Sequence, residues 1–414
     1  MTAPPQRPLG LFEGYGIEIE YVLVDAESLD VRPFTDRLLR AAAGTAEYVS
    51  DHDDGDIGWS NELVAHVLEF KTSGPVASLK GVDAAFDQSL GRAQAILARS
   101  GARLMPTGSH PWMDPARETQ LWEHEGAEIY HAYDRIFDCR RHGWANLQSV
   151  HLNLPFADEE ELGRLLAASR LVLPLLPALA ASSPFCEGRA TGLLDTRLDH
   201  YKENATLVPA MAGGIIPEPL YTIPEYQQGI FARIDAELLP HDPERLLVGH
   251  EWCNARGAIA RFDRMALELR LIDTQECPRA DIAIAAAASD AMRALVEERW
   301  ISWKEQKAFP HAPLAGLLDA AIARGPGAPV LDPRFAAAFG AHGAKTLGEL
   351  WAALLEQAYT GPAVQGEALD LILSQGTLAE RILRATGPAP ARARLLEVYG
   401  ELCGCLARGR QFEA

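Results

Sequence analysis

The chain has 414 residues, of which 48% are apolar and 23% are charged, so it is long enough to bury a large core. Against 57 acidic residues stand only 38 basic ones, and the net charge of −19 argues against nucleic acid and anionic membranes as partners. This charge does not exclude ATP, which metal ions and a few arginines could hold locally.

The cysteines and the apolar segments favour a cytoplasmic protein. Six cysteines are scattered without C-x-x-C spacing, which is typical of reduced thiols. Met1–Gly10 is rich in proline and lacks the pattern of a signal peptide. The apolar run Leu165–Ala181 is interrupted by Arg170 and two prolines and is shorter than a bilayer span, so it predicts a buried helix bent at the prolines.

The first predicted strand, Gly16–Tyr21, carries two glutamates on one face. Side chains two residues apart share a face of a strand, so Glu18 and Glu20 lie side by side, while Ile17 and Ile19 point the other way. Two like charges this close raise each other's pKa unless a cation lies between them. A solvated face of an antiparallel sheet is the competing interpretation of this strand alone.

Three further predicted strands repeat the arrangement. Their polar faces carry Glu69 and Lys71 in Val67–Lys71, with Glu62 just upstream, His151 and Asn153 in Val150–Leu154, and Glu268 and Arg270 in Ala266–Leu271. Carboxylates with one imidazole suit Mg²⁺ or Mn²⁺, whereas zinc prefers cysteine and several histidines at close spacing. The basic side chains among them indicate an anionic group such as phosphate. We therefore expect one sheet with a polar floor and an apolar underside.

The remaining segments complete the prediction of an α+β fold. Helices are expected at Asp36–Ala43, Ser78–Ser100, part of Ala116–Cys139, Asp158–Ala181, Arg279–Trp303, and over most of Thr346–Arg408. Asp51–Asp56 is expected to be an acidic loop, Arg103–Thr107 a strand, and Ala308–Pro333 a linker or irregular excursion. Strands mixed with long helices, without strict alternation, favour α+β, and apolar/polar alternation favours an antiparallel sheet.

No common nucleotide-binding loop is evident. The segment Gly340–Thr346 resembles a P-loop, but Ala344 replaces the glycine that should precede the lysine. The sequence has neither G-x-G-x-x-G nor G-x-S-x-G. If ATP is used, metal ions and a sheet floor must hold it.

Six motifs, in this order, resemble the glutamate–cysteine ligase type 2 family of ATP-dependent carboxylate–amine ligases. They are Gly16–Tyr21, residues 61–72, Gly108–Trp112, Gln148–Asn153, Ser182–Phe185 with Gly188, Arg189 and Arg197, and Leu267–Leu271 with Asp273. Together they extend over roughly residues 12–303. The resemblance implies a glutamine-synthetase-like fold, in which a curved, mainly antiparallel sheet, backed by helices, binds ATP and two or three Mg²⁺ (or Mn²⁺) ions.

The resemblance also implies roles for individual residues. The implied metal ligands are Glu18, Glu20, Glu62, Glu69, His151 and Glu268. The implied nucleotide contacts are Lys71, Asn153 and Arg270, the last near the γ-phosphate. Arg270, Arg189 and Arg197 are the implied catalytic residues, and Arg189 and Arg197 would anchor the substrate carboxylate or the transferring phosphate. Surface ion pairs for the arginines and a hydrogen-bonded core position for His151 are the alternatives.

The implied activity is ATP-dependent joining of a carboxylate, expected to be the γ-carboxylate of glutamate, to cysteine or another amine through an acyl phosphate. A metal-dependent kinase on the same scaffold and a non-catalytic nucleotide-binding protein are the alternatives. Residues 1–303 are expected to form the catalytic domain. Residues 304–414 carry no recognised motif and are expected to form a mostly helical region packed on it, compatible with a homo-oligomer.

Overall fold

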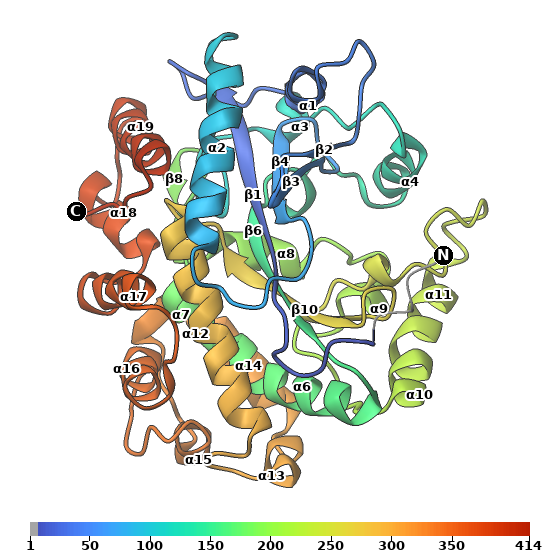
Figure 1. Ribbon diagram of the computed structural model, residues 1–414, viewed down its shortest axis with the longest axis vertical. Coiled ribbons are helices and arrows are strands. Elements are labelled where there is room, and N and C mark those ends of the chain that lie inside the picture. The colour runs from blue at the N-terminus through green and yellow to red at the C-terminus, as the bar shows by residue number, and fades with distance from the viewer. Residues whose placement is uncertain (1–6) are drawn as a thin grey trace.

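A computed structural model describes residues 7–414 (Figure 1). Within them the main sheet has eight strands, in the order β2-β3-β4-β1-β6-β10-β9, with β5 beside the second half of β1. The strands are β1 (Gly16–Asp25), β2 (Asp51–Asp53), β3 (Ile57–Asn61), β4 (Val67–Thr72), β5 (Ala102–Met105), β6 (Ser149–Pro155), β9 (Ala258–Arg261) and β10 (Ala266–Asp273). Every pairing is antiparallel. The predicted α+β fold with a mainly antiparallel sheet is confirmed.

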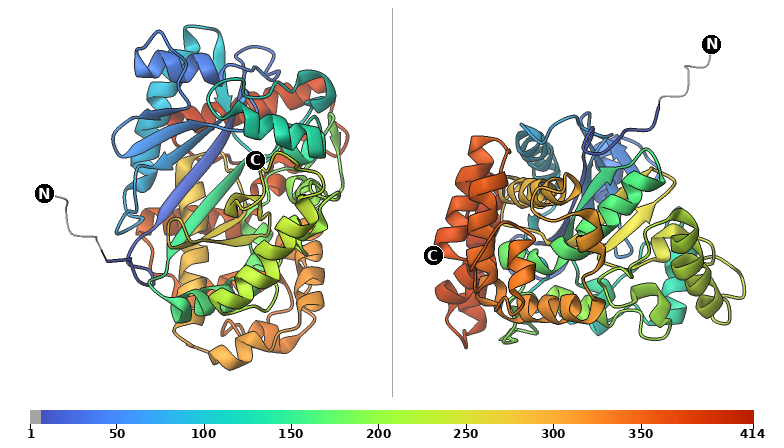
Figure 2. Two further views of the ribbon diagram at one scale, coloured as in Figure 1. Left: turned by 90° about the vertical axis from the view of Figure 1, so that its right-hand side faces the viewer. Right: turned by 90° about the horizontal axis from the view of Figure 1, so that it is seen from below.

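The apolar underside of the sheet packs against a layer of helices. Ile17, Ile19, Leu152 and Leu269 are fully buried there, as strand alternation predicts. Helix α12 (Pro278–Val296) contacts β6 and lies between α2 (Val82–Ala98), which contacts β3 and β5, and α6 (Glu159–Val172), which contacts β9 and β10. Figure 1 shows α2 and α12 crossing one face of the sheet. The left view of Figure 2, turned by 90°, looks onto the other face of the sheet.

The C-terminal region consists of helices that pack on different parts of the fold. They are α14 (His311–Arg324), α15 (Pro333–Ala337), α16 (Leu347–Ala358), α17 (Ala363–Gln375), α18 (Leu378–Thr386) and α19 (Arg392–Arg408). Helices α16 and α17 contact α12, and α19 contacts α2 and β5. The main apolar core contains side chains from both this region and the sheet. The division into residues 1–303 and 304–414 stays a prediction.

Several predicted elements differ from those observed. Ala308–Pro333 is not a linker, because α14 occupies its centre. Pro313 lies in the first turn of α14, where its missing N–H costs no hydrogen bond. Asp51–Asp56 is not only a loop, because Asp51–Asp53 pairs with β3. The long helix after Glu268 ends at Val296, and α13 (Trp303–Lys307) is a separate short helix.

The proline-containing apolar run is bent as predicted. Helix α6 passes into a 3₁₀ turn at Leu173–Leu175, and α7 (Pro177–Ala180) follows. Among the described residues, no helix combines the length and the apolar character that crossing a bilayer requires.

Several short elements complete the fold around the sheet. They are α3 (Pro115–Glu118), α4 (Ala127–Phe137), α5 (His142–Ala145), the hairpin β7 (Phe185–Cys186) and β8 (Arg189–Ala190), α8 (Thr196–Lys202), α9 (Pro209–Ala212), α10 (Ile223–Tyr226) and α11 (Ala232–Leu238). Helix α1 (Thr35–Ala43) lies near β2 and β3. Residues from α4, α5, α8 and α9 line a cavity above the floor.

Candidate active site

The register of four strands brings the predicted polar side chains onto one face. In the pairing of β1 with β4, Glu18 is opposite Lys71 and Glu20 is opposite Glu69. On the other side of β1, Glu18 is opposite His151 of β6. Asn153 of β6 is opposite Glu268 of β10. We call the polar residues of this face the floor: Glu18, Glu20, Glu69, Lys71, Ser149, His151, Asn153, Glu268 and Arg270.

His151 lies at the centre of the floor. Its Nδ1 is 2.9 Å from Glu18 Oε2 and 4.0 Å from Glu268 Oε1. Its Nε2 is 2.9 Å from the hydroxyl of Ser149. Burial and the charge of Arg270 lower the pKa of His151, but the hydrogen bond to Glu18 and the nearby carboxylates outweigh them and raise it.

The two glutamates of β1 have different environments. Glu20 accepts hydrogen bonds from the backbone N–H and the hydroxyl of Ser149, at 2.8 and 3.1 Å. Glu18 accepts from Asn153 Nδ2 at 3.2 Å and from Arg264 Nη1 at 2.9 Å. Burial acts to raise the pKa of Glu18, but His151 and Arg264 hold it below its usual range.

Arg270 lies where β10 is irregular. The pairing of β10 with β6 shifts register between Leu269 and Ile272, so one extra residue is accommodated there. Arg270 Nη1 donates to Glu268 Oε1 at 3.1 Å, and Arg261 Nη1 donates to Glu268 Oε2 at 3.0 Å. Two guanidinium groups therefore hold the fully buried Glu268 carboxylate from both sides.

Glu62 and Glu69 carry the clearest electrostatic signal for a cation. Burial, followed by the charges of Glu20 and Glu69, raises the pKa of Glu62 well above its usual range. Burial and the charge of Glu18 also raise the pKa of Glu69, although Lys71 Nζ lies 3.1 Å from its carboxylate. Carboxylates crowded in this way need a positive partner to ionise together.

The donor set fits a hard divalent cation. Two groups have ligand atoms within 4.8 Å of one another, namely Glu18, His151 and Glu268, and Glu20, Glu69 and His151. The Oδ1 atom of Asn153 is buried without a hydrogen-bond partner beside them. Mostly oxygen donors with one imidazole, in two overlapping groups, match Mg²⁺ or Mn²⁺ better than a tetrahedral zinc site.

Arg197 lies beneath the cavity in a buried ion pair with Asp273. Asp273 Oδ2 also accepts from the N–H of Ser182 at 2.9 Å and from the Ser183 hydroxyl at 2.8 Å. Gly108 packs directly against this carboxylate, and a Cβ there would lie 2.3 Å from the Asp273 carboxyl carbon. Residues from three of the motifs that resemble the family therefore hold Arg197 in position.

Two sequence-selected positions are not brought to the floor. Arg189 is exposed on the β7–β8 hairpin and does not line the cavity above the floor. His110 is fully buried, and its Nε2 lies 2.8 Å from the carbonyl oxygen of Leu29. The ring of Trp112 packs on Tyr399 and under Arg392, so residues 110–112 form a packed turn.

The floor opens into two cavities. One, of about 200 Å³, is bounded by Glu20, Glu62, His151, Arg197 and Arg270 and walled by aromatic residues. That wall consists of Tyr130, Tyr133, Trp144, Tyr201 and Trp252. The other is a groove of about 1050 Å³ whose lining includes Glu18, Lys71, Asn153, Arg264 and the segment Ser73–Pro75. The floor therefore borders a small cavity and a larger groove.

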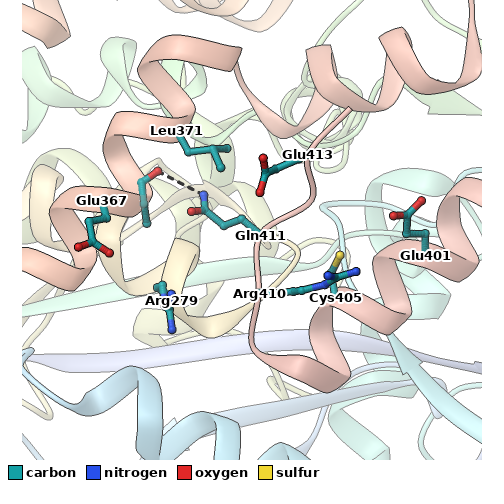
Figure 3. Close-up of a pocket in the computed structure, with 9 residues that line it drawn as sticks. Arg279, Glu367, Leu371, Glu401, Cys405, Arg410, Gln411 and Glu413 are labelled. Carbon is teal, nitrogen blue, oxygen red and sulfur yellow. Dashed lines mark hydrogen bonds between the residues drawn. The ribbon is translucent and has the colours of Figure 1, made fainter.

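A further cavity lies away from the floor. It has about 390 Å³ and is lined by α17, α19 and the C-terminal segment (Figure 3). Gln411 Nε2 donates to the carbonyl oxygen of Ala368 at 3.2 Å, the dashed contact in Figure 3. None of the predicted site residues lines this cavity.

Sequence analysis missed several polar contacts of the floor, among them Ser149, Arg261 and Arg264. Arg261 and Arg264 flank the turn between β9 and β10, and the register of this hairpin decides that they reach Glu268 and Glu18. The available sequence signal was the position of these two arginines just before a strand that carries Glu268 on its polar face. Ser149 precedes His151 by two residues, so strand alternation alone placed it on the same face.

Comparison with known proteins identifies the family. The sequence profile of glutamate–cysteine ligase family 2 (GCS2) matches residues 15–401. The chain belongs to this family. The match extends beyond residue 303 and includes most of the C-terminal helical region.

Individual relatives and one solved structure are also similar to this chain. An uncharacterised protein of Archaeoglobus fulgidus is 30% identical over 400 residues, covering 96% of this chain and 99% of the relative. A Rubrobacter xylanophilus protein named "Putative glutamate–cysteine ligase 2-3" is 32% identical over 186 residues, covering 44% of this chain and 46% of its own length. The crystal structure of the Francisella tularensis glutamate–cysteine ligase in complex with AMP has a TM-score of 0.57 at 13% identity. This likeness covers 96% of this chain and 89% of that one and shows a common fold.

Proposed function

We propose that the protein is an ATP- and Mg²⁺-dependent ligase that joins a carboxylate to an amine through an acyl phosphate. One observation carries the proposal, namely that carboxylates and an imidazole from β1, β4, β6 and β10 meet on one floor between two cavities. Membership of the glutamate–cysteine ligase family 2 supports it.

The groove of about 1050 Å³ is the proposed nucleotide site, because ATP is larger than the small cavity. Lys71 and Asn153 lie on its side of the floor and would contact the phosphates. Arg264, already beside Glu18, would join them there.

The metal ligands would be Glu18, Glu20, Glu62, Glu69, His151 and Glu268. When bound, the cations would neutralise the triphosphate and favour in-line transfer of its γ-phosphoryl group. Ser149 would fix the orientations of Glu20 and His151, since it hydrogen-bonds to both. Arg261 would do the same for Glu268.

The small cavity is the proposed site of the carboxylate and the amine. The donor carboxylate would lie between Arg197 and Arg270 and attack the γ-phosphorus, and ADP would leave. The amine would then attack the acyl carbon, and phosphate would leave as the amide forms. The aromatic wall would keep water from the acyl phosphate, which otherwise hydrolyses. We assign no general base, and Arg189 is given no contact with the reacting groups.

The finer assignments rest on the family. We propose glutamate as the donor, through its γ-carboxylate, and cysteine or another small amine as the acceptor. The six described cysteines are unpaired, which agrees with the cytoplasmic location that we propose.

A substrate panel tests the function. The purified protein is incubated with ATP, Mg²⁺, glutamate and a series of amino acids and amines, while ADP is quantified and the products are analysed by mass spectrometry. We expect ADP release that requires both a carboxylate and an amine, with formation of an amide. Stoichiometric formation of a stable phosphorylated acid without any amine would identify a kinase instead.

A further inference from the structure

Three side chains that the proposed function does not use meet beside the small cavity. His142 begins α5, Cys186 lies in β7 and His200 lies in α8. Their ligand atoms lie within 4.8 Å of one another. Cys186 Sγ is 3.4 Å from His142 Nε2 and 3.7 Å from His200 Nε2. The two imidazole rings are stacked, with centroids 5.0 Å apart.

These distances match the edges of a tetrahedral zinc site. A zinc ion about 2.3 Å from sulfur and about 2.05 Å from nitrogen holds those two ligand atoms about 3.5 Å apart. The two observed Sγ–Nε2 distances lie on either side of that value. Because the two ring planes are nearly parallel, at 18° to each other, one ring must also turn before both Nε2 lone pairs can point to one ion.

Burial shifts the pKa values of all three side chains. Burial, and then the neighbouring imidazole of His200, lower the pKa of His142. Burial lowers the pKa of His200. Burial raises the pKa of the Cys186 thiol to about 11, so an ion must displace the thiol proton as it binds.

We propose that His142, Cys186 and His200 form a binding site for zinc or a similar soft transition metal, separate from the magnesium floor. A thiolate with two imidazoles disfavours Mg²⁺, which prefers oxygen ligands, so the two sites select different ions. Three protein ligands leave a fourth position for water or for the exposed carboxylate of Glu187, whose Oε1 is 3.6 Å from His142 Nε2.

One contact opposes the ion and limits its affinity. Asn146 Nδ2 donates to His142 Nδ1 at 3.1 Å, which places the proton of the metal-free ring on Nε2. Binding moves this proton to Nδ1 and breaks the hydrogen bond. The loss of one neutral hydrogen bond corresponds to about tenfold in affinity.

An ion at this site would stabilise the wall of the small cavity. Helix α5 contributes Gly143 and Trp144 to that wall, and α8 contributes Tyr201 and Asn204. An ion held by His142 and His200 would tie these two helices to each other and to the β7–β8 hairpin. It would thereby stabilise one side of the cavity without contacting the reacting groups.

Cobalt substitution distinguishes this site from the floor, which contains no cysteine. The metal-free full-length protein is titrated with Co²⁺ in excess Mg²⁺, and the thiolate-to-cobalt charge-transfer band is recorded. We expect one Co²⁺ per chain with this band. We expect no band in Cys186→Ser and at least tenfold weaker binding in His200→Gln. The control Cys139→Ser, a buried thiol outside the cluster, should keep the band.

The melting temperature gives an independent measurement. Zn²⁺ should raise it in the wild type and in Cys139→Ser but not in Cys186→Ser, whose metal-free melting temperature should equal that of the wild type. The proposal is overturned if the wild type shows no charge-transfer band, if Cys186→Ser keeps it, or if His200→Gln binds Co²⁺ as tightly as the wild type.

Discussion

Glu20 on β1 lies directly opposite Glu69 on β4, so two carboxylates form a like-charge cross-strand pair. Such pairs normally destabilise a sheet. Both side chains are nearly fully buried, which strengthens their repulsion, and Glu62 lies close enough to have its pKa raised by both. We expect a bound cation to offset the cost of this arrangement.

Removing one of these charges tests that interpretation. In the absence of Mg²⁺, Glu69→Gln should leave the free energy of unfolding unchanged or raise it by up to about 1 kcal/mol, because repulsion is relieved. The same change should lower ligase turnover at least 100-fold. Urea denaturation in EDTA and a turnover assay measure the two effects.

Glu268→Gln is the matched comparison. This carboxylate pairs with Arg261 and Arg270, so its neutralisation leaves two guanidinium groups without their shared counter-charge. We expect a loss of about 3 kcal/mol of stability together with the loss of turnover. Equal stability of the two variants in EDTA would contradict the distinct roles given to Glu69 and Glu268.

Mg²⁺ itself should stabilise the protein through the floor. A ligand that binds only the folded state raises the melting temperature by mass action, and a few degrees are expected at saturating Mg²⁺. Differential scanning fluorimetry in Mg²⁺ and in EDTA measures the shift, which should largely disappear in Glu69→Gln. A wild-type melting temperature insensitive to Mg²⁺ would count against the floor as a metal site.

Gly108→Ala tests the support of Arg197. The new Cβ would press on the Asp273 carboxylate, which binds the Arg197 guanidinium, so we expect a loss of about 1–3 kcal/mol and a higher KM for the carboxylate substrate. Gly327→Ala is the control, since a Cβ there meets nothing within 4 Å and the residue lines neither of the two cavities at the floor. Unchanged KM and stability in Gly108→Ala would show that Asp273 does not constrain Arg197.

The free energy of unfolding should depend on pH through Asp87, which lies on α2 and away from the floor. Burial, and then Asp83, raise the pKa of Asp87 on α2 from 3.8 to about 6. A carboxyl group whose pKa is raised on folding loses stability as pH rises from its unfolded pKa through its folded pKa, here from about 4 to 6. Asp87→Asn should therefore gain about 1 kcal/mol over the wild type at pH 7, allowing for partial exposure, and gain nothing at pH 4. Urea denaturation at both pH values measures the difference, and an equal gain at both would refute this origin.

The floor was predictable from sequence because its residues alternate along strands with strongly apolar opposite faces. Strand alternation predicted that Glu18 shares a face with Glu20 and that His151 shares a face with Asn153. It could not predict which strands are neighbours in the sheet. The pairing of β1 with β4 and β6 is a long-range property, and so is the register that brings Arg261 and Arg264 to the floor.

The failures have local causes. Helix α14 was missed because its segment contains Pro313 and Gly316 and is followed by Gly325. Pro313 falls in the first turn and Gly325 just beyond the end, where these residues are tolerated, and Gly316 alone lies in the helix interior. The motif Gly108–Trp112 was selected by resemblance to the family. In the structure, Gly108 allows close packing against Asp273, and His110 hydrogen-bonds to the buried carbonyl oxygen of Leu29. A motif alone does not separate a supporting residue from one that touches substrate.

Metal-dependent nucleotide binding tests the central claim most directly. Isothermal titration of the protein with a non-hydrolysable ATP analogue is carried out in Mg²⁺ and in EDTA, for the wild type and for Glu18→Gln. We predict binding in Mg²⁺ that weakens at least tenfold in EDTA and at least tenfold in the variant. Equal affinity of the wild type with and without Mg²⁺, unchanged in Glu18→Gln, would contradict the account.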